Sequence, residues 1–110
     1  MIQHIVMMKF HPEVGAAEID ALESAMDALP DKITEIFTYE FGRDVIRSER
    51  SYDFALVSSF ANLATLKAYQ THPEHLKLLA MLKPMCTSIL VVDFETKEGA
   101  TRGVEPPLVL

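Results

Sequence analysis

Three side chains that could carry out acid–base chemistry lie close together in the stretch AYQTHPEHLK, residues 68–77. Tyr69, His72 and His75 are spaced three residues apart, and Pro73 lies between the two histidines. A neutral imidazole can remove a proton next to a ketone or thioester, and a phenol can hydrogen-bond the oxygen that becomes negative. The same side chains could instead satisfy backbone groups at a break between two helices, so the residue types leave both interpretations open.

Pro73 determines how these side chains are presented. It has no backbone N–H and disfavours helical backbone at His72, yet it suits the first turn of a new helix. We therefore predict a break at this point and a separate helix over residues 73–83. His75 then lies in the first turn of that helix, beside unpaired backbone N–H groups that disfavour a charged imidazole. This placement makes His75 the candidate catalytic base and Tyr69 its partner.

The hydrophobic periodicity predicts the elements that hold these residues. Strands are predicted over residues 3–10, 32–41, 52–60 and 88–95, and helices over residues 16–29, from Leu63 through Tyr69, and over 73–83. Pro30 and Asp31 are expected to stop the first helix, and Asn62 is expected to cap the second. The order β-α-β-β-α-α-β is that of a ferredoxin-like α+β domain, with a split βαβ arrangement and a four-stranded antiparallel sheet carrying helices on one face.

Further pocket residues are expected on the predicted strands. His4 shares a strand face with Val6, Met8 and Phe10. A histidine among apolar neighbours is usually a hydrogen-bonded core residue, but it joins a ligand pocket when its face lines the interior of a barrel. The side chains expected to line the ligand pocket are His4, His72, Phe37 and Tyr39.

A sheet with helices on one face leaves its other face uncovered. That face carries either Ile33, Phe37 and Tyr39 or the alternate set of side chains. Hydrophobic residues make up 49% of the 110 residues and the mean hydropathy is +0.14, which is apolar for so small a soluble domain. We expect a second copy to cover this face, so that a homodimer forms an α+β barrel from two sheets.

The composition excludes several classes of partner and location. The net charge is −6 and the basic residues are scattered, so no nucleic acid is expected as a partner. No apolar run is long enough for a membrane span, and MIQHIVMMKF lacks the features of a signal peptide. Cys86 is the only cysteine, so no intrachain disulfide can form and a reducing, cytoplasmic location is expected.

A metal site would have to use His4, His72 and His75. The last two flank a proline break, and no Cys, Asp or Glu stands at a familiar ligand spacing from them. We therefore predict no metal ion, and nothing in the sequence points to a cofactor.

Several motifs occur in an order that resembles a known family. They are HIVMMKF near the start, YEFGRDV at 39–45, YDFALVSSF at 52–60, LKAYQTHPEH at 66–75 and ILVVDFE at 89–95. Together they resemble the stress-responsive dimeric A/B barrel family, also called Dabb. The resemblance implies a homodimeric α+β barrel, with one domain over residues 1–96. Residues 97–110 are a C-terminal tail without a counterpart in the plant member described next, and the sequence leaves open whether this tail packs on the partner subunit.

The resemblance also implies a candidate activity. One plant member of the family closes the ring of a linear polyketide by aldol condensation, without a cofactor, and it carries the same Tyr-x-x-His-Pro-x-His arrangement. By position, Tyr69 and His75 match its pocket tyrosine and catalytic histidine, and His72 and His4 match two further histidines. This implies a pocket for a small, apolar, carbonyl-bearing ligand, with cofactor-free acid–base chemistry of the cyclase or lyase type. The alternative is a dimer without a reaction, in which the motif only builds the helix junction.

Overall fold

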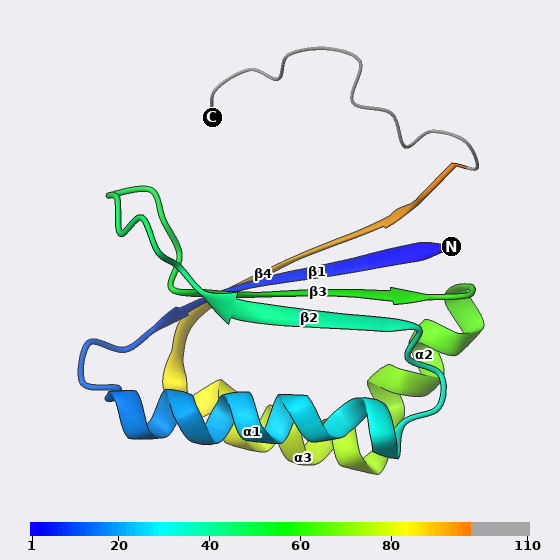
Figure 1. Ribbon diagram of the computed structural model, residues 1–110, viewed down its shortest axis with the longest axis horizontal. Coiled ribbons are helices and arrows are strands. Elements are labelled where there is room, and N and C mark those ends of the chain that lie inside the picture. Colours follow the sequence, from blue (N-terminus) through cyan, green and yellow to red (C-terminus); the bar gives the residue numbers. More distant parts are fainter. Residues whose placement is uncertain (98–110) are drawn as a thin grey trace.

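The chain folds as a four-stranded antiparallel sheet with helices on one side (Figure 1). The computed structural model describes residues 1–97. Its elements are β1 (Ile2–Phe10), α1 (Ala16–Lys32), β2 (Thr38–Arg43), β3 (Phe54–Phe60), α2 (Leu63–Thr71), α3 (Pro73–Leu82), a short 3₁₀ helix η1 (Lys83–Met85) and β4 (Cys86–Glu95). The strands pair in the order β2-β3-β1-β4. This is the ferredoxin-like α+β arrangement that the sequence predicts.

β1 is a central strand of the sheet and sets which side chains face the helices. Its even-numbered residues His4, Val6 and Met8 are buried, as the alternating pattern predicts. Residues directly opposite each other on antiparallel strands point to the same face. His4 is opposite Ser58 of β3 and Asp93 of β4, so these three side chains lie on the helix side of the sheet.

The hydrophobic core lies between α1 and the sheet. Leu22, Met26 and Leu29 recur at the spacing of one helix face and are almost completely buried. They form one cluster with strand residues that include Met8 and Phe60. Burial of this face fixes α1 on the sheet and leaves the polar side chains of the helix outside.

The first helix is longer than the sequence predicts. It continues through Pro30 and ends at Lys32, although Pro30 was expected to stop it. Pro30 lies in the last turn, and the residue after the helix, Ile33, is completely buried and donates its N–H to the carbonyl of Leu29 at 2.9 Å. Burial of Leu29 and Ile33 therefore holds a turn that the proline alone would weaken.

The prediction of a strand over residues 32–41 was wrong in its first half. β2 begins only at Thr38, because Ile33 is used to end α1 and to fill the core. Phe37 lies in the connection and is 68% exposed, and its N–H is bonded to Ser59 at the edge of the sheet. Ile33, Phe37 and Tyr39 consequently do not share one strand face.

The break between α2 and α3 is formed as predicted. Asn62 caps α2, since its side-chain oxygen accepts a hydrogen bond from the N–H of Thr65 at 2.9 Å. Pro73 is the first residue of α3, and His72 between the two helices has extended backbone, with φ −65° and ψ 137°. The two helices therefore meet at an angle instead of forming one continuous rod.

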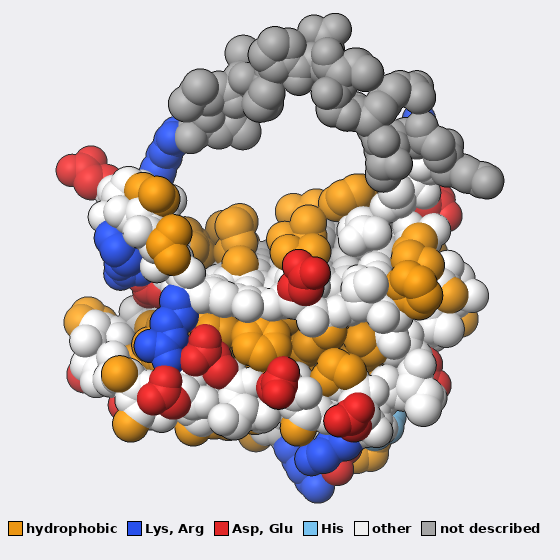
Figure 2. Space-filling view, viewed as in Figure 1, with side chains coloured by type: hydrophobic (Ala, Val, Ile, Leu, Met, Phe, Trp, Pro, Cys, Tyr) orange, Lys and Arg blue, Asp and Glu red, His pale blue; other side chains and the backbone are white. Residues whose placement is uncertain are grey.

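Among residues 1–97, the face of the sheet opposite the helices is apolar and is not covered by another element. Met7, Val57, Leu90, Val92 and Phe94 lie on it, and their side chains are between 38% and 57% exposed. Figure 2 shows hydrophobic side chains standing out on this side, and Figure 1 shows the loop between β2 and β3 rising from the same side. The predicted C-terminal tail lies outside the described residues from residue 98 onward. Within residues 1–97, no helix is long and apolar enough to cross a membrane.

Replacement of Leu22 by Ala tests the core. Leu22 is completely buried, so its truncation removes apolar contacts and leaves a cavity, and we expect the free energy of unfolding to fall by about 2–5 kcal/mol. The matched control is Leu63→Ala, because Leu63 is 67% exposed and its truncation should change stability by at most about 0.5 kcal/mol. Urea denaturation followed by circular dichroism measures both. Equal effects of the two substitutions would contradict this description of the core.

Candidate functional site

A cavity of about 180 Å³ lies between the helix side of the sheet and the helices α2 and α3. Its lining is mostly apolar and includes leucines of α3 (Leu78, Leu79, Leu82). The polar side chains that line it are His4, Tyr69, Gln70 and His75. Ile89 and Val91 of the edge strand β4 also line the cavity and are partly exposed, so it opens to solvent on that side.

The helix junction brings Tyr69 and His75 together. Tyr69 is near the end of α2 and His75 is in the first turn of α3, and both side chains are buried. Their ring centroids are 4.2 Å apart. The change of direction at His72 turns the two rings toward each other, which a spacing of six residues in one straight helix would not do.

Hydrogen bonding determines which nitrogen of His75 carries a proton. Nδ1 of His75 lies 3.1 Å from the backbone carbonyl oxygen of Gln70. A carbonyl oxygen only accepts hydrogen bonds, so Nδ1–H must be the donor. In the neutral ring the lone pair is therefore on Nε2, the atom that a general base uses.

Burial keeps the His75 ring neutral. Removal from water lowers the pKa of His75 below its ordinary value of 6.5, and positive charge on His4 or His72 would lower it further. The bond to Gln70 acts in the opposite direction without cancelling the effect. The direction of the shift is the expected one, but its largest cause is burial, whereas the sequence argument relied on the N-terminal end of the helix.

Tyr69 is paired with a second phenol. Its hydroxyl oxygen lies 2.9 Å from that of Tyr39 on β2. Burial raises the pKa of Tyr39 to about 12 and raises that of Tyr69 as well, so both phenols keep their protons at neutral pH. One hydroxyl donates to the other, and the proton of the accepting hydroxyl remains for a further acceptor such as a carbonyl oxygen.

His4 is held by a residue that the sequence analysis did not single out. Its Nδ1 lies 2.5 Å from Oδ1 of Asp93, which is opposite His4 in the pairing of β1 with β4. The carboxylate accepts the Nδ1–H and leaves Nε2 of His4 for other contacts. Asp93 interrupts the apolar run of ILVVDFE, and this acidic residue within an apolar strand was the available signal.

Two residues that were expected to line the pocket lie elsewhere. His72 caps α3, because its Nδ1 accepts the N–H of Glu74 at 3.1 Å, and it is not among the residues around the cavity. Phe37 points into solvent from the connection before β2. Tyr39 does not line the cavity itself, but its hydroxyl is hydrogen-bonded to that of Tyr69, which does. Among residues 1–97, no three His, Cys, Asp or Glu side chains are grouped closely enough to hold a metal ion.

The site therefore combines a neutral imidazole, a pair of protonated phenols and a second imidazole held by a carboxylate. His4 and His75 both surround Tyr69, with ring centroids at 6.1 and 4.2 Å from that of the phenol. Such a set can accept a proton at one point and donate a hydrogen bond at another within a mostly apolar cavity.

Comparison with known proteins finds a family model and relatives that match most of the chain. A model of the Stress responsive A/B Barrel Domain matches residues 2–96. An uncharacterized protein of Streptomyces coelicolor is 30% identical over 97 residues, which cover 86% of this chain and 99% of the relative. A stress-response A/B barrel domain-containing protein of Arabidopsis thaliana is 22% identical over 111 residues, which cover 98% of this chain and 52% of that relative. The chain thus spans about half the length of the plant relative.

Solved structures show the same fold. A dimeric ferredoxin-like protein of unknown function from Thermobifida fusca superposes with a TM-score of 0.80 at 32% identity, over 86% of this chain and 90% of that one. A hydroxynitrile lyase from Passiflora edulis also has a TM-score of 0.80, at 20% identity over 88% of this chain and 94% of that one, a similarity of fold alone. With the match over residues 2–96, these similarities establish that the chain belongs to the stress-responsive A/B barrel (Dabb) family.

Proposed function

We propose that this protein binds a small, apolar carbonyl compound in the cavity beside His75 and removes a proton from the carbon next to the carbonyl group. The observation that carries the proposal is the state of His75. Its ring lines the cavity, its Nδ1–H is bonded to Gln70, and its pKa is lowered, so Nε2 is a free base at neutral pH.

The volume of the cavity limits the ligand. About 180 Å³ corresponds to roughly six water molecules, and typical ligand pockets are larger, at about 300–1,000 Å³. A compound with a single ring suits this volume, whereas a long polyketide does not. The leucines of α3 and the side chains of Val6 and Met8 supply an apolar surface for such a ring.

The proton transfer can be written for a ketone. Nε2 of His75 takes the proton from the carbon next to the carbonyl group, and the electron pair of the broken C–H bond forms the C=C bond of an enolate. The negative charge moves to the carbonyl oxygen, where the free hydroxyl proton of the Tyr39–Tyr69 pair donates a hydrogen bond. Return of the proton from His75 to the carbon completes an exchange. Alternatively, the enolate carbon attacks a second carbonyl group within the same ligand, and the alkoxide formed there takes the proton from Nε2 of His75 to give an aldol product.

His4 supports the same reaction from the strand side. The hydrogen bond to Asp93 fixes its tautomer and orientation, as a carboxylate does for an imidazole in other acid–base sites. In the proposal, Nε2 of His4 is the second polar contact for the ligand, and His75 acts as the base.

A second interpretation has observations of its own. Both motif histidines bond to the backbone, His75 to Gln70 and His72 to Glu74, and these bonds stabilise the junction whether or not a ligand binds. In this interpretation the motif builds the helix junction and the protein acts as a dimer without a reaction. The two interpretations differ in the effect that a ligand has on the wild-type protein.

We also propose that the protein is a homodimer whose subunits pack through the uncovered face of the sheet. Similar structures from Thermobifida fusca, Bacteroides fragilis and Jannaschia are described as dimeric. The exposed apolar side chains of β1, β3 and β4 on this face form a continuous surface that favours association. Two sheets packed through it enclose the apolar surface of both copies.

Exchange of the methyl protons of acetophenone for deuterium tests the base. In D₂O, we expect the wild-type protein to accelerate this exchange and His75→Ala to lose the acceleration by about 100-fold or more, because general bases contribute at least this factor. Proton NMR measures the loss of the methyl signal. Leu76→Gln is the matched control, since Leu76 is exposed on the same helix and does not line the cavity.

Thermal unfolding with and without acetophenone separates the two interpretations. A binding site predicts that the melting temperature of the wild type rises with ligand concentration and that this rise is lost in His75→Ala. A wild type that shows neither a thermal shift nor exchange, together with a destabilised His75→Ala protein, would refute the catalytic proposal and support the helix-junction interpretation.

The lowered pKa of His75 predicts the pH dependence of both activity and stability. The exchange rate should rise with pH and level off, with a midpoint below 6.5, because only the neutral ring is a base. As the pH falls below 6.5, the unfolded chain binds the His75 proton before the native protein does, so the free energy of unfolding falls. Urea titrations across this range should show that the free energy of unfolding falls less with decreasing pH in His75→Gln than in the wild type. A midpoint above 6.5 would contradict the assignment of His75.

The dimer is tested by Val92→Asp. Val92 is exposed on the uncovered face, and a charge there should convert the dimer into a monomer without unfolding the subunit. Light scattering after gel filtration should give twice the 12.3 kDa chain mass for the wild type and the single chain mass for the variant. Leu63→Asp is the control, because Leu63 is an exposed hydrophobic residue on the helix side. A wild-type monomer would refute the proposal.

A further inference from the structure

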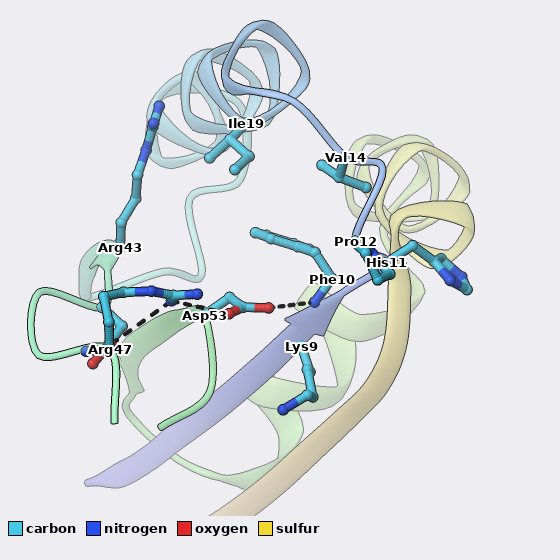
Figure 3. A pocket seen from close by; sticks show the side chains of 10 residues that line it. Lys9, Phe10, His11, Pro12, Val14, Ile19, Arg43, Arg47 and Asp53 are labelled. Atoms are coloured by element: carbon cyan, nitrogen blue, oxygen red, sulfur yellow. Dashed lines mark hydrogen bonds and ion pairs between the residues drawn. The ribbon is translucent and has the colours of Figure 1, made fainter. Parts of the chain in front are cut away.

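A second cavity, larger than the one beside His75, lies at another part of the molecule. Its volume is about 500 Å³, and it shares no lining residue with the His75 cavity. It is formed by the end of β1, the start of α1 and the loop between β2 and β3 (Figure 3). The proposed proton abstraction makes no use of it.

One wall of this cavity is apolar. Ile19 of α1 points toward the ring of Phe10, and Val14 lies on the connection between them (Figure 3). Phe10 is buried and packs on Phe54 with ring centroids 6.0 Å apart, so its position is fixed. Ile19 and Val14 are only partly buried and leave apolar surface for a further group.

The other wall carries two guanidinium groups. Nη1 of Arg47 lies 2.9 Å from Asp53 and 3.7 Å from Asp44, and Nη2 of Arg43 pairs with Asp20 and, at 2.8 Å, with Glu23. Each group uses a single nitrogen atom for its ion pairs within residues 1–97. A guanidinium has five N–H donors, so both retain donors for a ligand.

These two arginines are held in place before any ligand binds. Asp53 accepts the backbone N–H of Phe10 at 2.8 Å through one oxygen and pairs with Arg47 through the other, which ties the loop to β1. Burial tends to raise the pKa of Asp53, but the bonds from Phe10 and Arg47 outweigh it and lower that pKa, so Asp53 is ionised at neutral pH. Arg43 likewise joins β2 to α1.

Arg47 has a backbone conformation that arginine seldom adopts. Its φ is +58°, and its N–H is bonded to Oδ2 of Asp44 at 2.6 Å. Such a conformation is strained in a residue other than glycine and occurs preferentially at functional sites. The side chain of this strained residue extends to the cavity, where its guanidinium group pairs with Asp53.

The surrounding charges select among anions. Asp44 and Asp53 lie beside Arg47, so a dianion such as phosphate meets two negative charges near the group it would bind. Lys9 and His11 point away from the ring of Phe10 (Figure 3), and the positive charge of Lys9 acts on Asp53, which leaves Asp44 without that compensation. A single negative charge on an apolar body fits better, because the apolar wall contributes to binding while the charge needs only one guanidinium edge.

We propose that this cavity binds a small organic carboxylic acid. Its carboxylate lies against Arg47, and its apolar body packs on Phe10, Val14 and Ile19, while Arg43 extends toward α1 at the border of the cavity (Figure 3). The site is separate from the His75 cavity, so a ligand can occupy each at the same time.

Chemical-shift mapping with phenylacetate tests the proposal. We expect saturable shifts of the backbone amides of Phe10, Val14, Ile19 and Arg47 in ¹H–¹⁵N spectra of the wild-type protein. Two probes serve as controls on the same protein. Phenylacetamide has the same shape without the charge, acetate has the charge without the ring, and both should bind at least about tenfold more weakly. Equal binding of phenylacetamide, or shifts centred on Tyr69 and His75, would overturn the proposal.

Variants test the two guanidinium groups. Arg47→Gln should raise the dissociation constant of phenylacetate by about tenfold, since a charge-assisted hydrogen bond is lost, and Arg43→Gln, which removes a more distant charge, should raise it by less. Arg50→Gln removes an exposed charge from the same loop and should leave the dissociation constant unchanged. The spectra themselves show whether each variant is folded, and Arg43→Met and Arg47→Met, which also remove the charge but keep a long side chain, replace any variant that is not. Unchanged binding in folded variants of both arginines would refute the assignment.

Discussion

The missing backbone N–H of Pro73 is the constraint on which the His75 site depends. A helix that began at Leu63 could not continue through this residue, so α2 ends, His72 becomes extended and α3 begins in a new direction. The two helices then close over one cavity instead of passing along it. Tyr69 and His75 reach contact because they belong to different helices, and the carbonyl of Gln70 is free to accept from His75 because α2 ends just beyond it.

The two cavities differ in whether the polar groups around them are charged. Around His75, burial keeps the imidazole and both phenols uncharged, because each charged form would lose its contact with water. At the other cavity, exposure to water permits a network of full charges in which Arg43 and Arg47 bridge separate elements. Such partly exposed ion pairs add little to stability, so the network is better understood as fixing the position of the loop than as holding the fold together.

Local chemistry could be predicted from the sequence where it depended on neighbouring residues. The cap at Asn62 and the helix start at Pro73 needed only adjacent groups, and the Dabb fold followed from motifs in a fixed order. Pro30 was misjudged because the burial of Ile33, a tertiary effect, outweighs the local preference. The pairing of His4 with Asp93 was missed because it depends on the register between two strands far apart in the chain, which one sequence does not reveal. Long-range packing also explains why Phe37 was wrongly expected in the cavity and why the arginine-lined cavity was not predicted. His72 lies outside the His75 cavity for a local reason, because its side chain caps α3 at Glu74.

β1 contributes to both cavities and to the uncovered face at once. His4, Val6 and Met8 border one cavity, Phe10 borders the other, and the residues between them point to the opposite side of the sheet. Because side chains alternate with a period of two, loss or gain of one residue in this strand would exchange its two sides. Both cavities would then lose their strand-side groups and the outer surface would receive a histidine and a phenylalanine. A substitution in β1 therefore affects one surface at a time, whereas an insertion or deletion affects both cavities and the uncovered face together.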